Sequence, residues 1–224
     1  MFADLKSVTK FYLGRFEAVL LMAVTILLPI LLCHSFVVNT IYLLVVDRAT
    51  EIAGDFYYSL VSFQTFIFSL SPFILLLKED YYNGEIRFKK IYVDFFIRAF
   101  QLFIFSIIFS IIVAFGVFFF VIPGIVACIL MIGIPFTALI QDKNIWKSLR
   151  TSYIFGKQNF FKLLVMILLV SGFEIIIDFI SQFLVYKVTD LAAAQMLVQM
   201  IINMIIFPVL AMWLSKFYLS WLEK

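Results

Sequence analysis

Glu174 and Asp178 are the residues whose type and position in the sequence are most suited to chemistry, because both acids lie within a long apolar stretch. Their spacing of four places them on one face of a helix. In a helix that crosses a membrane, a carboxyl group is costly to insert, so it usually faces protein or water and marks a functional site. The pair is therefore a candidate site for a bound substrate or a relayed proton.

Further polar side chains extend this candidate site. On the same predicted helix, the acidic face continues through Ser171, Ser181 and Gln182. Polar residues at a similar depth in the first and last apolar stretches are His34, Asn39, Gln195, Gln199 and Asn203. If these three helices touch, we expect a polar pocket with the substrate- or proton-binding residues Glu174, Asp178, His34, Gln199 and Asn203.

Two interpretations of these polar residues stay open. In the functional one, the carboxyl groups bind a cation or pass on a proton, and His34 carries a compensating proton. In the structural one, the side chains form hydrogen bonds that hold the helices together. Glu174 and Asp178 favour the functional interpretation, whereas His34 alone and the row of glutamine and asparagine favour the structural one.

The rest of the sequence gives little support to an enzyme. It has no nucleophile elbow, no glycine-rich phosphate loop and no metal-binding CxxC or HExxH motif. Its two cysteines, Cys33 and Cys128, lie in apolar stretches, where a thiol behaves as a small hydrophobe. A net charge of +3 without a basic domain argues against nucleic acid as a partner. We expect no catalytic residue, no metal and no cofactor.

Membrane-spanning helices are the elements that position the candidate site. Hydrophobic residues make up 65% of the chain and charged residues 14%, whereas soluble domains have about 45–50% and about 25%. A helix needs about 20 apolar residues to cross a bilayer, so the uncharged stretches predict one all-α integral membrane domain over residues 1–224. Its expected spans are residues 18–46, 56–77, 99–122, 124–141, 163–186 and 191–215.

Proline and glycine indicate where these spans turn or bend. Pro123 and Gly124 predict a tight turn between the third and fourth spans. Pro29 predicts a bend in the first span, and Gly133 with Pro135 predicts a kink in the fourth.

The basic residues predict the orientation of the bundle. All but two of the 17 lysines and arginines lie in the N-terminal segment, the second and fourth connections and the C-terminal tail. The exceptions are Arg48 and Lys187. Because basic residues are retained on the cytoplasmic side of short loops, both termini are expected in the cytoplasm. The abundance of phenylalanine, isoleucine and lysine is compatible with a bacterial plasma membrane.

Three connecting segments also indicate amphipathic helices at the cytoplasmic interface. In residues 85–98, apolar side chains recur at helical spacing beside basic ones. Residues 2–16 and 145–153 show the same pattern more weakly. We expect a short surface helix before each transmembrane hairpin. The alternative is that any basic segment beside an apolar span looks amphipathic over one or two turns.

Residues 120–164 carry features of a known family. Pro123 and Gly124 open a span, a short loop and a helix with Ser152 follow, and the aromatic pair 160–161 leads into the next span. In these features the chain resembles the six-helix bacterial membrane domain that occurs free-standing or fused to glycerophosphodiester phosphodiesterases. The resemblance implies an all-α membrane domain and no phosphodiesterase activity, because it does not extend to the catalytic domain.

Two functions from different classes are compatible with the sequence. The polar stripe favours a small transporter or resistance-type protein with an intramembrane polar site. The short outer loops and basic surface helices favour a noncatalytic scaffold or an accessory subunit of a membrane complex, which would bind another membrane protein or a second copy. The lipid bilayer is a partner in both cases.

Overall fold

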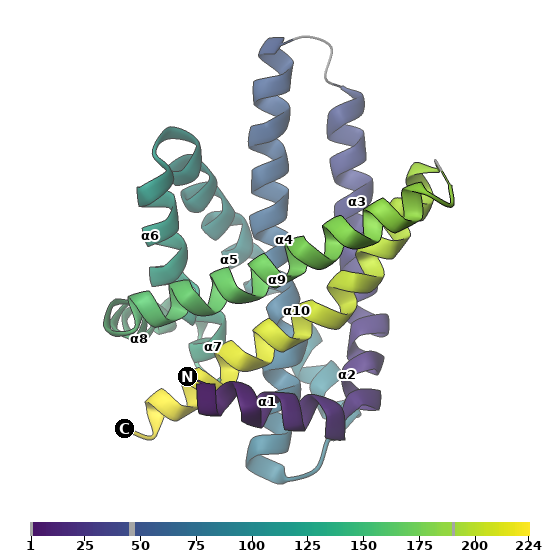
Figure 1. The fold of residues 1–224 in the computed structure, drawn as a ribbon. Helices are drawn as coiled ribbons and strands as arrows, with labels where there is room; N and C mark the ends of the chain where they lie inside the picture. The colour runs from purple at the N-terminus through teal and green to yellow at the C-terminus, as the bar shows by residue number, and fades with distance from the viewer. Residues whose placement is uncertain (1, 45–47, 190) are drawn as a thin grey trace.

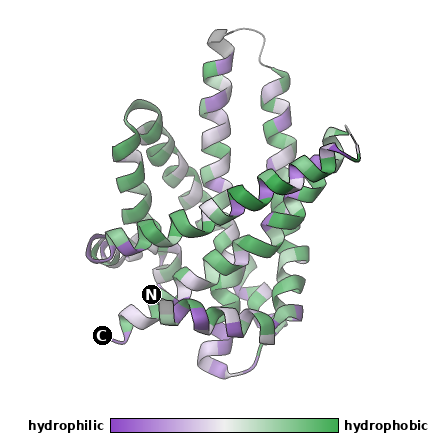
Figure 2. Cartoon of the chain, viewed as in Figure 1, coloured by the Kyte–Doolittle hydropathy of each residue, from purple (hydrophilic) through white to green (hydrophobic). Residues whose placement is uncertain are grey.

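The computed structural model describes residues 2–44, 48–189 and 191–224. The chain is 91% helical, and these ranges contain no strand. Six helical stretches in them are long and apolar enough to cross a membrane, as the sequence predicts. Apolar residues dominate these stretches (Figure 2), so the chain is an all-α, multi-pass membrane protein.

The spans differ in length and regularity (Figure 1). The first combines α2 (Phe16–Met22), the π-helix η1 (Ala23–Leu27) and α3 (Leu28–Leu43). The others are α4 (Arg48–Asn83), α5 (Phe88–Phe119), α6 (Val121–Met131) with α7 (Gly133–Ile140), α9 (Phe160–Tyr186) and α10 (Ala192–Leu222). Two helices, α1 (Phe2–Gly14) and α8 (Ile145–Gln158), lie outside the spans. Val46, the expected end of the first span, lies outside the described residues.

Prolines account for the irregular parts of two spans. Pro29 has no backbone N–H, so the carbonyl four residues before it loses its usual partner. The π-helix η1 occupies this position, and the bend predicted there thus takes the form of a wider helical turn. In the fourth span, Ile132 separates α6 from α7, so the helix is interrupted next to Gly133 and Pro135, where a kink was predicted.

The turn between the third and fourth spans was predicted wrongly. The residue between α5 and α6 is Phe120, which has an extended backbone, and Pro123 and Gly124 lie in the first turn of α6. A proline is tolerated there because the N–H groups of a first helical turn have no partner within the helix. Gly124 instead allows close packing, since a Cβ on Gly116 would lie 2.7 Å from its Cα.

Residues 85–98 were predicted to form a separate surface helix. Instead, α5 begins at Phe88, and residues 88–98 are its first part. No proline or glycine interrupts the helix near Arg98, so it continues unbroken into the apolar span. Its apolar face packs inside the bundle, where Ile91 is 1% exposed and Phe95 5% exposed. For the same reason, α4 and α10 extend beyond their predicted ends, to Asn83 and Leu222.

The other two predicted amphipathic segments form helices. In α1, Val8 is buried against the bundle, and the hydroxyl of Tyr12 donates to the carbonyl of Ile205 at 3.1 Å. The first turn of α8 is capped by Asn144, whose side chain accepts a hydrogen bond from the backbone N–H of Trp146 at 3.0 Å. Both helices lie at the end of the molecule that also holds the two termini (Figure 1).

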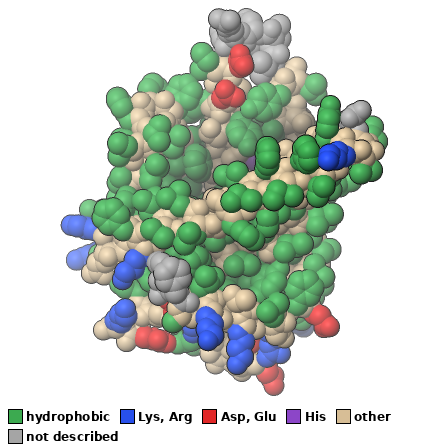
Figure 3. Space-filling view, viewed as in Figure 1, with side chains coloured by type: hydrophobic (Ala, Val, Ile, Leu, Met, Phe, Trp, Pro, Cys, Tyr) green, Lys and Arg blue, Asp and Glu red, His purple; other side chains and the backbone are tan. Residues whose placement is uncertain are grey.

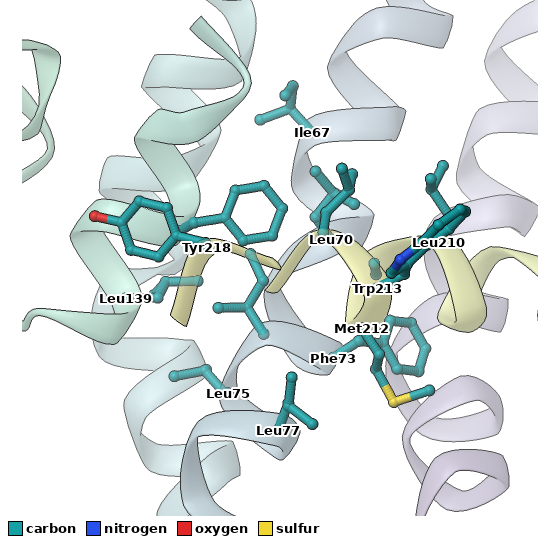
Figure 4. Close-up of a cluster of buried hydrophobic side chains, with 14 of the residues drawn as sticks. Ile67, Leu70, Phe73, Leu75, Leu77, Leu139, Leu210, Met212, Trp213 and Tyr218 are labelled. Atoms are coloured by element: carbon teal, nitrogen blue, oxygen red, sulfur yellow. The ribbon is translucent and has the colours of Figure 1, made fainter. Parts of the chain in front are cut away.

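The core lies where α10 crosses α4. Buried side chains of α4, such as Leu70 and Phe73, meet Leu210 and Trp213 of α10 (Figure 4). Beside them, the buried hydroxyl of Tyr218 donates to Oγ1 of Thr137 at 2.9 Å. In contrast, α9 packs mainly on α10 and stays largely exposed, and apolar side chains cover its visible face (Figure 3). This arrangement leaves space between α9 and the first two spans.

Candidate functional site

Glu174 lies on α9 and lines a cavity of about 280 Å³ between α9, α10, α4 and the first span. Ser171 lines it from the same helix and Asn203 from α10. Among the described residues, no side chain or backbone group hydrogen-bonds the Glu174 carboxyl group. The charged group that acts on it is another acid, Asp178, one turn further along α9. The carboxyl group of Glu174 therefore points into the bundle, as the sequence predicts.

Asp178 interacts with the side-chain amide of Gln199 on α10. This juxtaposition matches the depths expected from two helices that run in opposite directions. The Oδ1 atom of Asp178 is buried and has no hydrogen-bond partner in the described ranges. One oxygen of the carboxyl group is thus left without a protein donor.

A second, larger cavity of about 650 Å³ adjoins the first. Asn203 and His34 line both cavities, and Gln199 lines the larger one. Its other polar lining residues are Ser35, Asn39, Tyr58, Gln182 and Gln195. Apart from His34, none of these side chains normally ionises near neutral pH, so the larger cavity is polar without a fixed charge. Ser181, predicted on the same face, lines neither cavity.

His34 connects the first span to the second. Its Nδ1 atom lies 3.1 Å from Oγ1 of Thr65 on α4, which is hydrogen-bonding distance. The ring is partly buried at the junction of the two cavities. The structure therefore brings the histidine to the same place as Glu174, Gln199 and Asn203. The fifth residue of the predicted pocket, Asp178, lines neither cavity.

Sequence reasoning missed the contribution of α4. Ser62, Thr65 and Ser69 recur at helical spacing and line the smaller cavity opposite Glu174. A row of hydroxyl groups on one face of an apolar helix is a readable signal. It is a weak one, because serine and threonine in helices often bond to carbonyl groups of their own helix.

Buried oxygen atoms without a hydrogen-bond partner converge on this region. In the described part of the chain they are Oγ of Ser62, Oγ of Ser69, Oδ1 of Asp178 and Oδ1 of Asn203. Three of the four belong to residues that line the smaller cavity. Each unpaired buried polar atom costs about 1–3 kcal/mol, so the arrangement suits a space that water or a polar ligand fills.

The charge around the two cavities is one-sided. Glu174 lines the smaller cavity and Asp178 lies beside Gln199 of the larger one. No lysine or arginine is among the described residues that line either cavity. The site is therefore suited to a cation, a proton or a hydrogen-bond donor rather than to an anion.

Comparisons with known proteins do not add to this picture. No protein-family profile matches the chain, and no curated protein or solved structure matches it significantly. The resemblance to the phosphodiesterase-associated membrane domain therefore stays a prediction. The function has to be inferred from the geometry of the cavities.

Proposed function

We propose that this protein is a small transporter or resistance-type membrane protein that binds its substrate, or a coupled ion, in the two adjoining cavities. The observation that carries the proposal is the convergence of unpartnered buried oxygen atoms around Glu174. A site of this kind is stable only when its polar groups find partners. Water supplies them in the resting protein, and a substrate replaces that water when it binds.

A purely structural role fits Glu174 less well. Polar residues that hold membrane helices together do so by hydrogen bonds across the helix interface. Glu174 makes no such bond among the described residues, and its cavity separates α9 from α4 instead of joining them. An acid within a membrane span that forms no hydrogen bond among the described residues is costly to keep there, which supports a role in binding.

The position of the cavities also supports transport. The larger one reaches Ala192 and Ala193, at the tip of the α9–α10 hairpin. With the termini in the cytoplasm, as the basic residues predict, this tip faces outward. Leu210, a residue of the buried core, lines the smaller cavity. In that orientation the larger cavity lies on the outward side of the smaller one, which suits entry of a substrate from outside.

Neutralising both acids tests the proposal. The double variant Glu174→Gln/Asp178→Asn keeps the size and hydrogen-bonding capacity of the side chains but removes their charge. Expressed in a deletion strain, it should fail to complement the sensitivity of that strain to toxic compounds, while its abundance in the membrane stays normal. The matched control is Asp55→Asn, since Asp55 is an exposed acid that accepts a hydrogen bond from Tyr42 outside both cavities.

Full complementation by the double variant would contradict the proposal and favour a structural role. An accessory-subunit function makes a different prediction, namely that a stoichiometric membrane protein copurifies from native membrane. A transporter that works alone, or as a homo-oligomer, should copurify with no such partner.

A further inference from the structure

A third cavity, of about 440 Å³, lies between α3, α4 and α5. Its lining is mainly apolar and includes Pro29, Ile30, Cys33, Val37, Phe68 and Phe103. Cys33 is exposed, and Val37 and Phe103 are 40% and 44% exposed. Because these residues lie in membrane-spanning helices, their exposed surfaces face lipid. We call this space the lipid-side groove.

The lipid-side groove adjoins the cavity of Glu174. His34 lines the groove and both polar cavities, and Thr65 lines the groove and the smaller polar cavity. The hydrogen bond between these two side chains therefore lies at the boundary. The side chains of His34 and Thr65 thus lie between the lipid-side groove, which is apolar, and the polar cavity that holds the Glu174 carboxyl group.

The charged residues around the three cavities favour a cation over an anion. Glu174 has no cationic partner in the described ranges, and no lysine or arginine is among the described residues that line the three cavities. In a cavity enclosed by protein and lipid, charges are screened less than in bulk water, so an unpaired carboxylate attracts a cation and repels an anion. Apolar walls with a few placed polar groups are the usual composition of a site for a small organic molecule.

We propose that the site takes amphiphilic organic cations, with the hydrophobic body in the lipid-side groove and the cationic group beside Glu174. The ligand would enter from the bilayer between α3 and α5, where the groove is exposed. This inference rests on the proposed transport function and specifies its substrate class.

Tetraphenylphosphonium and tetraphenylborate are the matched probes, because they share size and shape and carry opposite charges. Binding to the purified full-length protein in detergent should be saturable for the cation, at one site per chain, and absent for the anion above the level of empty micelles. Glu174→Gln/Asp178→Asn should weaken cation binding about tenfold or more, since it removes the negative charge that would pair with the bound cation. Equal binding of both probes, or unchanged binding by the variant, would overturn the proposal.

A second variant tests the groove itself. Cys33→Trp fills the lipid-side groove from an exposed position, so it should weaken binding of tetraphenylphosphonium while gel filtration still shows a folded protein. The control is Ile176→Trp on the exposed face of α9, which should leave binding unchanged. Cys128→Trp would not serve, because Cys128 packs against the core. Unchanged binding by Cys33→Trp would show that the cation does not occupy the groove.

The two proposals fail in different ways. If neither probe binds but the acid-neutralised variant still loses complementation, the transport function stands and the substrate class is wrong. If neither probe binds and that variant complements fully, both proposals are wrong.

Discussion

Replacing Arg87 and Lys90 together by alanine should destabilise the bundle, because both side chains bind the carboxylate of Glu79. Glu79 lies near the end of α4, and its side chain is 4% exposed. The Nε atom of Arg87 donates to Oε1 at 2.6 Å, and the Nζ atom of Lys90 donates to Oε2 at 2.7 Å. These bonds tie the beginning of α5 to the end of α4.

The size of the effect follows from the exposure of the three groups. Leaving a buried charge without its partner costs about 3–5 kcal/mol. The side chains of Arg87 and Lys90 are 54% and 44% exposed, so water already competes with them for the carboxylate. We therefore expect the low end of that range, about 3 kcal/mol. Adding Glu79→Gln removes the buried charge and should restore about 1–2 kcal/mol, since an amide with unmet hydrogen bonds still carries a cost.

The free energy of unfolding can be measured in mixed micelles of dodecyl sulfate and a mild detergent, with tryptophan fluorescence as the signal. Lys89→Ala is the matched control, because Lys89 is exposed and forms no ion pair among the described residues; it should change stability by less than about 0.5 kcal/mol. A triple variant as unstable as the double variant would refute the reasoning, since the loss would then come from packing and not from charge.

Three further predictions concern packing, hydrogen bonding and topology. Gly116→Leu should destabilise the α5–α6 hairpin by about 2 kcal/mol or more in the same assay, because a Cβ there meets backbone at 2.7 Å, whereas Gly172→Leu, with nothing within 4 Å, should be tolerated. Tyr218→Phe should cost about 1–2 kcal/mol, since it removes the hydroxyl group that bridges the fourth and sixth spans. A cysteine introduced at Glu51 should react with an impermeant thiol reagent on intact cells and one at Asn144 should not; the reverse labelling would contradict the orientation.

Much of the fold could be predicted from hydropathy, because a bilayer requires long apolar helices and the sequence supplies five long apolar stretches, one of them long enough for two spans. The errors arose where local chemistry permits two outcomes. Pro123 suits a turn and also the first turn of a helix, and only the packing of Gly124 on α5 decides between them. Residues 85–98 suit a surface helix and also the start of a span. Their ion pairs with Glu79 of α4 hold them against the bundle, and this contact cannot be read from the periodicity of the segment alone.

The candidate site was predictable in part. Glu174 and Asp178 stand out because acids inside an apolar span are rare. Their neighbours are set by how the helices pack, which hydropathy does not encode. The smaller cavity, lined by the α4 hydroxyl row, depends on the path of α9, which stays apart from α4. No pattern within one helix indicates this separation.

We propose that the cavities around Glu174 form a water-accessible site within the membrane. Two cysteine variants of α10 test this most directly. Asn203→Cys places a thiol on both polar cavities, and Ile201→Cys places one on a surface that is 55% exposed and faces lipid. With Cys33 and Cys128 replaced by alanine, a small cationic methanethiosulfonate reagent added outside should modify the Asn203→Cys variant and leave the Ile201→Cys variant unmodified. Equal rates, or an unreactive Asn203→Cys variant that is folded and abundant, would contradict the account.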